Sequence, residues 1–376
     1  MVLVIFRMKS ETRKLQQVGH STLMISLPKE WVRATNLSQG DSLTIQQNDD
    51  GTLNILPSGI PQKKEVVKCI VDSDKCKKPN LLTRIITGVY IIGHETLEIY
   101  SKKGFEPEHL AEIRKTIHGL TGMSIVEQDM SHVVIKNFVD PTRFPAIGLM
   151  RIIYMITSWM QEASIQALKE NRKNLANEVI HMEKEVDRIY WLIILQLLLA
   201  AKDKSVEKKI GIESSQNIVG SRTVAKILEK IGDLAEDIAI QVITILDSDY
   251  PPDQSAIDDL EKMFKMIQKV YDESTKGFFS TNINMANDAL ENVLAISTEF
   301  TKVTNSVLTN FTNNLEKKNG RQDFQKIDTY LSLRTILWIF SQIAGYCGTI
   351  SEITINRVLE RPSNICKFEM QPPEHI

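Results

Sequence analysis

The spacing of hydrophobic residues in the first part of the chain is typical of short β-strands. In "TLMISLP" leucine and isoleucine occupy every second position, as in a strand with one buried face. The next stretch, "KEWVRATNL", predicts one short helix. Segments 42–47 and 52–56 flank an Asp-Asp-Gly turn, which predicts a β-hairpin. Proline and glycine then end this region, so we expect a first domain over residues 1–61.

Strand and helix patterns alternate over residues 62–141. The expected order is strand, helix, strand, helix, strand, strand: "EVVKCIVD", "NLLTRIITGVYIIG", "ETLEIYS", "EPEHLAEIRKTIHGL", "SIVEQDM" and "HVVIKNFV". This order predicts a small α+β domain, for which a ferredoxin-like arrangement is one option. The segment contains no chemical motif, so the sequence predicts no role for it.

Helical periodicity dominates residues 142–362, and a tail of residues 363–376 follows. Six long helices are expected, over residues 143–170, 174–202, 214–248, 253–278, 285–316 and 325–359. The segment "SRTVAKILEKIGD", which starts at Ser221, aligns with "LRTILWIFSQIAG", which starts at Leu333. This internal repeat predicts two related three-helix bundles, over about residues 142–250 and 251–362.

Composition narrows the function classes. With 45 Lys+Arg against 47 Asp+Glu, the formal net charge is −2, so any nucleic-acid binding must come from a local basic patch. The four cysteines form no CxxC pair and are not typical of a disulfide framework. The apolar run "WLIILQLLLAA" is much shorter than the ~20 residues that cross a bilayer. We therefore expect a cytoplasmic protein without membrane insertion.

One helix in the first repeat, "RTVAKILEKIGDLAEDIAIQVI", carries an unusual number of carboxylates. At helical spacing Glu229, Asp233 and Glu236 lie within about 60° of one another, with Asp237 beside them, opposite the apolar stripe. A solvated acidic face is the simplest explanation. However, like charges one turn apart repel, and only Lys226 and Lys230 lie nearby to compensate the acids.

The preceding helix repeats the same spacing with Glu183 and Asp187. Two such pairs on adjacent helices can present four carboxylates to one point. Oxygen ligands of this kind suit Mg²⁺, Mn²⁺, Ca²⁺ or iron. A catalytic di-iron bundle would need Glu-x-x-His pairs that face the bundle core, and no His stands three residues after Glu183 or Glu229. P-loop, HExxH, GxSxG and GxGxxG motifs are absent from the sequence. We expect no enzyme.

The second repeat lacks this pattern. In the alignment of the two repeats, the counterparts of the acids in the later helix are Ser341, Gly345 and Thr349. In the earlier helix a looser alignment gives Ala295 and Glu299. We therefore expect one metal site, in the first helical repeat.

The first domain, residues 1–61, resembles the AbrB/SpoVT/MazE swapped-hairpin family through "RKLQQVG", "LMISLPKEW", "LSQGDSL" and "GTLNILP". The resemblance implies a small swapped-hairpin β-barrel made by an intertwined homodimer. It also implies DNA binding by basic residues near the first strand and helix: Arg13, Lys14, His20, Lys29 and Arg33. His20 stands where relatives often have arginine. Residues 1–61 carry six cations and five anions, so dimerisation without DNA binding is the alternative.

The helical part resembles the PhoU family through "HMEKEVDRIYWLI". This resemblance implies two three-helix bundles, a part in phosphate homeostasis, and metal binding by Glu/Asp-xxx-Asp motifs. The candidate metal ligands are Glu183, Asp187, Glu229, Asp233 and Asp237.

These features predict a multidomain α+β protein that regulates transcription of phosphate uptake. In this interpretation an AbrB-like homodimer or higher homo-oligomer binds DNA, and the PhoU-like part senses metabolic or metal state. The alternative is an adaptor that acts on a phosphate transporter or sensor kinase and uses its first domain only to dimerise. A carboxylate-bridged metal enzyme or metal store is a third option.

Overall fold

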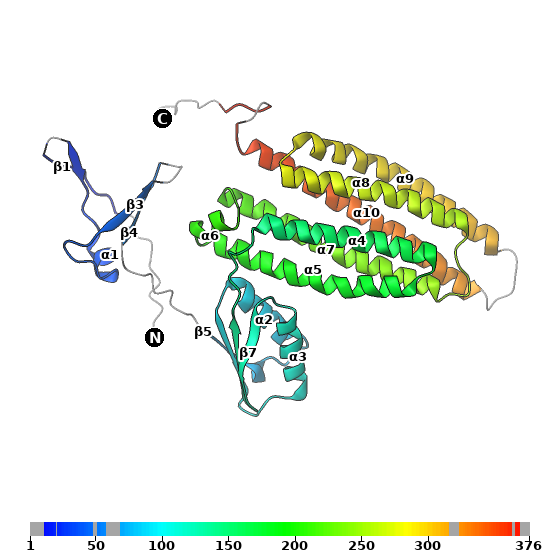
Figure 1. Ribbon diagram of the computed structural model, residues 1–376, viewed down its shortest axis with the longest axis horizontal. Helices are drawn as coiled ribbons and strands as arrows, with labels where there is room; N and C mark the ends of the chain where they lie inside the picture. Colours follow the sequence, from blue (N-terminus) through cyan, green and yellow to red (C-terminus); the bar gives the residue numbers. More distant parts are fainter. Residues whose placement is uncertain are drawn as a thin grey trace. The chain divides into compact units, whose positions relative to one another are not determined.

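The computed structural model describes residues 11–19, 21–47, 51–57, 68–315, 323–362 and 365–368 (Figure 1). The chain divides into two compact units, Met1–Val66 and Val67–Ile376. The predicted boundary between residues 141 and 142 falls inside the second unit, between its sheet and its long helices. Among the described residues, no helix combines the length and apolar character needed to cross a bilayer.

The first unit contains two antiparallel hairpins and one short helix. Its elements are β1 (Gln16–Val18), β2 (Thr22–Met24), α1 (Lys29–Ala34), β3 (Leu43–Gln47) and β4 (Leu53–Pro57). β1 pairs with β2, and β3 pairs with β4, in two separate sheets. The predicted order of strands, helix and hairpin is confirmed. The described strands of one chain close no barrel.

Apolar side chains of this unit remain in contact with water. Leu15, Leu23, Ile45 and Leu53 are each exposed by 62% to 64%, and α1 buries no residue. An isolated two-stranded hairpin is at best marginally stable in water. The described part of this unit therefore has no hydrophobic core of its own within one chain.

A four-stranded sheet begins the second unit. In chain order its elements are β5 (Lys68–Asp72), the 3-10 turn η1 (Ser73–Lys75), α2 (Leu81–Ile92), β6 (Thr96–Tyr100), α3 (Pro107–His118), β7 (Met123–Gln128) and β8 (His132–Asn137). The strand order is β5-β6-β8-β7, with β5 parallel to β6 and the other pairs antiparallel. Both helices lie on the same side of this sheet (Figure 1).

The topology of this sheet differs from the ferredoxin-like option. A ferredoxin-like fold places its strand hairpin between its two helices. Here the β7–β8 hairpin follows both helices, so the predicted element order and α+β class are right but the ferredoxin-like arrangement is wrong. The domain joins one β-α-β connection, from β5 through α2 to β6, to a terminal hairpin.

The sheet region packs directly on the helical region. Gly93 ends α2 with φ of 87°, and a Cβ at this position would lie 2.7 Å from Leu199 Cδ2. The amine of Lys202 donates to the Ile92 carbonyl at 3.2 Å. The end of α2 therefore lies against the end of a long helix.

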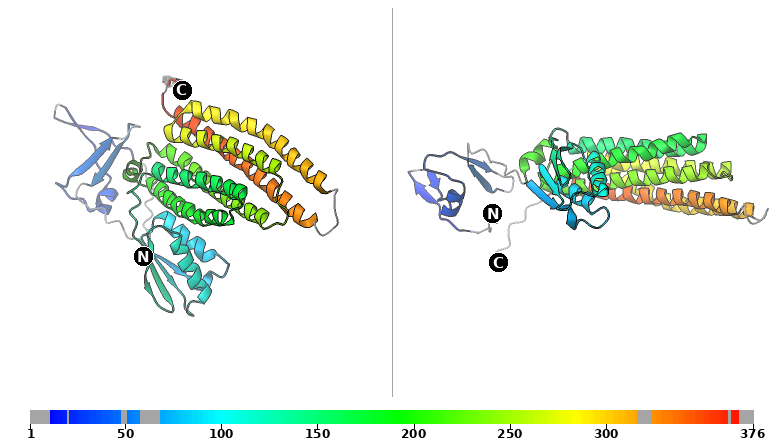
Figure 2. Two further views of the ribbon diagram at one scale, coloured as in Figure 1. Left: turned by 45° about the vertical axis from the view of Figure 1, so that its right-hand side comes forward. Right: turned by 90° about the horizontal axis from the view of Figure 1, so that it is seen from below.

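The remaining elements are helices. They are α4 (Ala146–Glu170), α5 (Lys173–Ala200), α6 (Lys204–Lys209), α7 (Ser215–Leu246), α8 (Gln254–Ser280), α9 (Ile283–Leu315) and α10 (Asp323–Leu359). α4, α5 and α7 pack against one another, as do α8, α9 and α10. α7 contacts α10, and α4 contacts α8, which joins the two bundles side by side (Figure 2). The predicted pair of three-helix bundles is confirmed.

Burial shows how the two repeats correspond. Ser221, Ile231 and Val242 in α7 are buried. The residues aligned with them in α10 are Leu333, Ile343 and Thr354, and these are buried as well. The predicted alignment is therefore correct for this helix pair.

The alignment of the preceding helices is different. Ala176 and Val186 in α5 match the buried Ala286 and Ile296 in α9. The αL residues Asn171 and Thr281, which end α4 and α8, are separated by the same offset. The predicted alignment with Ala295 and Glu299 is wrong by two positions, because the chain between the matched positions of the two helices is longer in the second repeat.

Candidate metal centre

The packing of α5 on α7 places the candidate carboxylates next to one another. Gly232 is buried in this contact, and a Cβ there would lie 3.0 Å from Val186 Cγ1. Gly232 precedes Asp233, and Val186 precedes Asp187. The small residue therefore lets the two helix backbones approach closely at the level of the two aspartates.

Three carboxylates meet across this contact. Glu183, Asp187 and Asp233 each offer one oxygen atom, and these three atoms lie within 4.8 Å of one another. Metal–oxygen bonds are about 2.0–2.6 Å long, so two oxygens on the same ion are separated by at most about 4–5 Å. The arrangement of these donors fits a divalent cation that bridges α5 and α7.

Glu229 and Asp237 lie outside this group of three oxygens. Glu229 is buried, and both its oxygens accept hydrogen bonds from the Lys226 amine, at 2.5 and 2.6 Å. Asp237 is exposed. The structure thus brings together three of the five predicted ligands.

Burial and mutual repulsion raise the pKa of several of these acids. Partial burial, followed by the neighbouring charge of Asp187, raises the pKa of Glu183 to about 7. Burial and then the charge of Asp233 raise the pKa of Asp187. These carboxylates are half-buried rather than fully solvated, and their negative charges are only partly compensated.

Two residues that were not among the predicted ligands lie next to this group of three acids. Glu236 is half-buried, and its pKa is raised first by burial and then by Asp237. The Lys230 amine contacts Asp233, and this contact raises the pKa of the lysine. The helical spacing indicated Glu236, but it could not indicate which lysine contacts which acid.

The second bundle has no equivalent group among the residues that the structure describes. With the corrected alignment, the counterparts of Glu183 and Asp187 are Val293 and Ser297. In α10 the counterparts remain Ser341, Gly345 and Thr349. Within the described residues, the cluster on α5 and α7 is the one group of three metal-ligating side chains that is close enough to share an ion.

The predicted DNA-contacting side chains belong to the first unit. Arg13 and Lys14 precede β1, and Lys29 and Arg33 lie on α1; all four are exposed. Arg13 forms an ion pair with Glu11. His20 lies outside the described residues.

Comparisons with known proteins identify the two segments. Residues 151–242 match the family model of the PhoU domain, and this match includes all five predicted metal ligands. Residues 16–65 match the family model described as antidote-toxin recognition MazE, bacterial antitoxin. Both resemblances seen in the sequence are therefore confirmed. No curated protein matches the chain.

Two solved structures resemble the chain at low identity. PhoU from Pseudomonas aeruginosa is 15% identical, with a TM-score of 0.49, over 57% of this chain and 95% of that protein. The phosphate transport system regulatory protein PhoU from Streptococcus pneumoniae is also 15% identical, with a TM-score of 0.44, over 56% of this chain and 89% of that protein.

Proposed function

We propose that the chain is a non-enzymatic, homodimeric transcriptional regulator of phosphate uptake. The observation that carries this proposal is the presence of a MazE-type segment and a PhoU-domain segment in one chain. The first would bind DNA, and the second would sense metabolic or metal state.

The exposed apolar residues of the first unit support dimer formation. Leu23, Ile45 and Leu53 are each more than 60% exposed in one chain. Removal of apolar surface from water contributes about 25 cal/mol per Å². A second copy that covers these side chains would supply the missing core, and a twofold axis is the common arrangement for such a pair.

The twofold axis would also double the cationic groups available to DNA. Arg13, Lys14, Lys29 and Arg33 are exposed on each chain. Two copies present eight such side chains, enough to neutralise several phosphates.

The carboxylate centre is the proposed sensing element. Glu183, Asp187 and Asp233 would hold Mg²⁺, Mn²⁺, Ca²⁺ or iron, which would supply the positive charge that the cluster lacks. Without it, repulsion between these acids weakens the α5–α7 contact. A change in this contact, transmitted through the dimer, would alter the spacing of the two DNA-binding faces.

One observation favours an adaptor as the second candidate function. Residues 1–61 carry six cations and five anions, a small excess of positive charge for a DNA-binding domain. In this case the first unit would only dimerise, and the helical part would act on a phosphate transporter or sensor kinase.

Chromatin capture with sequencing tests the proposal against the adaptor. The wild-type chain is expected to enrich promoters of phosphate-uptake genes. The Lys29→Ala/Arg33→Ala variant is expected to lose that enrichment at equal protein levels. Absence of any enriched promoter for the wild type would favour the adaptor.

A further inference from the structure

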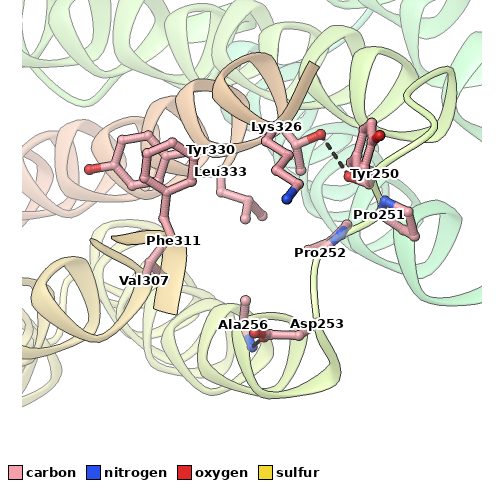
Figure 3. A pocket seen from close by; sticks show the side chains of 11 residues that line it. Tyr250, Pro251, Pro252, Asp253, Ala256, Val307, Phe311, Lys326, Tyr330 and Leu333 are labelled. Atoms are coloured by element: carbon pink, nitrogen blue, oxygen red, sulfur yellow. Dashed lines mark hydrogen bonds between the residues drawn. The ribbon is translucent and has the colours of Figure 1, made fainter. Parts of the chain in front are cut away.

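A cavity of about 390 Å³ lies at one end of the second bundle, where α8 begins, α9 ends and α10 begins (Figure 3). The pocket is lined by Tyr250, Pro251, Pro252, Asp253, Ala256, Val307, Phe311, Lys326, Thr329, Tyr330 and Leu333. Small-molecule pockets in proteins measure about 300–1,000 Å³, so this volume suits a small ligand.

The corresponding end of the first bundle is filled by the chain itself. The connection between α5 and α7 contains α6 and buries Ile210 and Ile212, which are 0% and 5% exposed. The Ile210 carbonyl accepts a hydrogen bond from the Ala146 amide at 2.9 Å. Ala146 is the counterpart of Ala256, a residue of the pocket wall. Ile210 and Ile212, which we call the isoleucine plug, therefore occupy the position equivalent to the cavity.

The second repeat has no such plug in its sequence. Its connection between α9 and α10 is residues 316–322, "EKKNGRQ", which contain no apolar side chain. The first repeat uses residues 201–214 for the same connection. The sequence of the second connection therefore supplies no counterpart of Ile210 and Ile212.

The polar groups of the lining favour an anion. The Lys326 amine points into the cavity and lies 5.4 Å from the centre of the Tyr250 ring (Figure 3). The Asp253 carboxylate already caps α8, where it accepts from the Ala256 amide at 2.9 Å and the Ser255 hydroxyl at 3.0 Å. The Thr329 hydroxyl donates to the Tyr250 carbonyl at 2.9 Å. Lys326 is the one cationic residue of the described lining.

We propose that this cavity is a binding site for a small organic anion with an apolar body, such as a medium-chain carboxylate. The apolar body replaces the missing isoleucine plug against Val307, Phe311 and Leu333. The carboxylate of the ligand pairs with Lys326. This site shares no residue with the carboxylate centre on α5 and α7.

Calorimetric titration of the full chain with octanoate, and separately with octan-1-ol, tests both halves of the proposal. Octanoate is expected to bind more tightly than octan-1-ol. Lys326→Gln is expected to weaken octanoate binding about tenfold, in line with the loss of one charge-assisted contact, and to leave octan-1-ol binding unchanged. Lys276→Gln, which changes a lysine outside the pocket, is expected to change neither affinity.

Leu333→Phe provides a second variant, which adds bulk to the cavity wall. It is expected to abolish binding of both probes without lowering the thermal unfolding temperature, because the larger ring fills existing space. The proposal is overturned if octanoate fails to bind the wild type at millimolar concentration. It is also overturned if Leu333→Phe binds octanoate as the wild type does, or if Lys326→Gln leaves octanoate affinity unchanged.

Discussion

Asp187 and Asp233 come from different helices, and their carboxylates share one half-buried space with Glu183. Each acid raises the free energy of its neighbours' charged forms. A bound divalent cation would reverse this effect, because it attracts all three charges. Substitution of individual acids therefore changes both the repulsion within the group and its capacity to bind a metal.

Replacement of both aspartates tests metal binding at the residue scale. Asp187→Asn with Asp233→Asn is expected to abolish bound divalent metal, because an amide keeps the shape of the side chain but not its charge. Helical content is expected to persist. Elemental analysis after dialysis measures the metal, and circular dichroism measures the helices.

Ser341→Ala is the matched control, because Ser341 is the counterpart of Glu229 in the second bundle. It is expected to leave metal content unchanged. Wild-type stoichiometry in the double aspartate variant would locate the metal elsewhere or exclude it.

The raised pKa of Glu183 makes stability depend on pH. Its pKa is about 7 in the folded protein, against about 4.3 for a glutamate in an unfolded chain. The folded state therefore binds this proton more tightly. The resulting stability is present in full below the unfolded pKa and is lost as pH rises through about 7.

Urea unfolding with a chelator present measures this effect. Glu183→Gln removes the titrating group, so its free energy of unfolding relative to wild type is expected to rise between about pH 4 and pH 8. A difference between the two proteins that does not vary with pH would contradict the assigned pKa.

At the scale of elements, the site depends on how closely α5 and α7 approach. Gly232→Ala would place a methyl group 3.0 Å from Val186 Cγ1, so the buried Val186 side chain or the two helices must shift by a few tenths of an ångström. Overpacking of this kind typically costs about 1–3 kcal/mol, which exceeds the gain in helix propensity. We expect lower stability and weaker metal binding, measured by denaturant unfolding and metal titration.

Gly345→Ala is the matched control for this change. Gly345 is the exposed counterpart of Asp233, and a Cβ there meets no atom within 4 Å. The substitution is expected to stabilise α10 by about 0.5–1 kcal/mol. Equal effects at both glycines would show that close helix packing is not what distinguishes Gly232.

Helical periodicity predicted the long helices and the repeat, because the buried stripes of α7 and α10 carry the same spacing. It did not predict that α5 and α9 align at a different offset from α7 and α10. That difference depends on the length of chain between the matched positions, which apolar spacing within one helix does not report. For a similar reason the sequence did not indicate the cavity beside Lys326, because its lining comes from segments that lie far apart in the chain.

The candidate site was predicted in part. The spacing of Glu183 and Asp187 indicated that both lie on one side of α5, and Asp233 of α7 lies close to both. Glu229 was also expected to be a ligand, but it is buried and accepts hydrogen bonds from Lys226 instead. The spacing of residues along one helix does not predict this contact. A helical projection gives the direction of a side chain but not its partner.

At the scale of the whole molecule, the proposed function needs a second chain to cover the apolar side chains of the first unit. Leu23→Asp with Ile45→Asp would place charges on apolar positions that are 62% and 63% exposed in one chain. We expect a monomer, because each buried charge opposes association. Light scattering of the full chain measures the mass. A variant that stays dimeric would show that another surface joins the chains.

The proposed function depends on DNA binding by the basic residues of the first unit, and the salt dependence of binding tests this contact. Each neutralised phosphate contributes a slope of about −0.9 to the log–log plot of affinity against salt concentration. Arg13→Ala with Lys14→Ala removes four cations per dimer, so the slope is expected to flatten by about three to four units if all four contact phosphates. Both side chains are exposed, so the fold should persist. A folded double variant that retains the affinity and salt slope of the wild type would contradict DNA binding by this face and favour the adaptor.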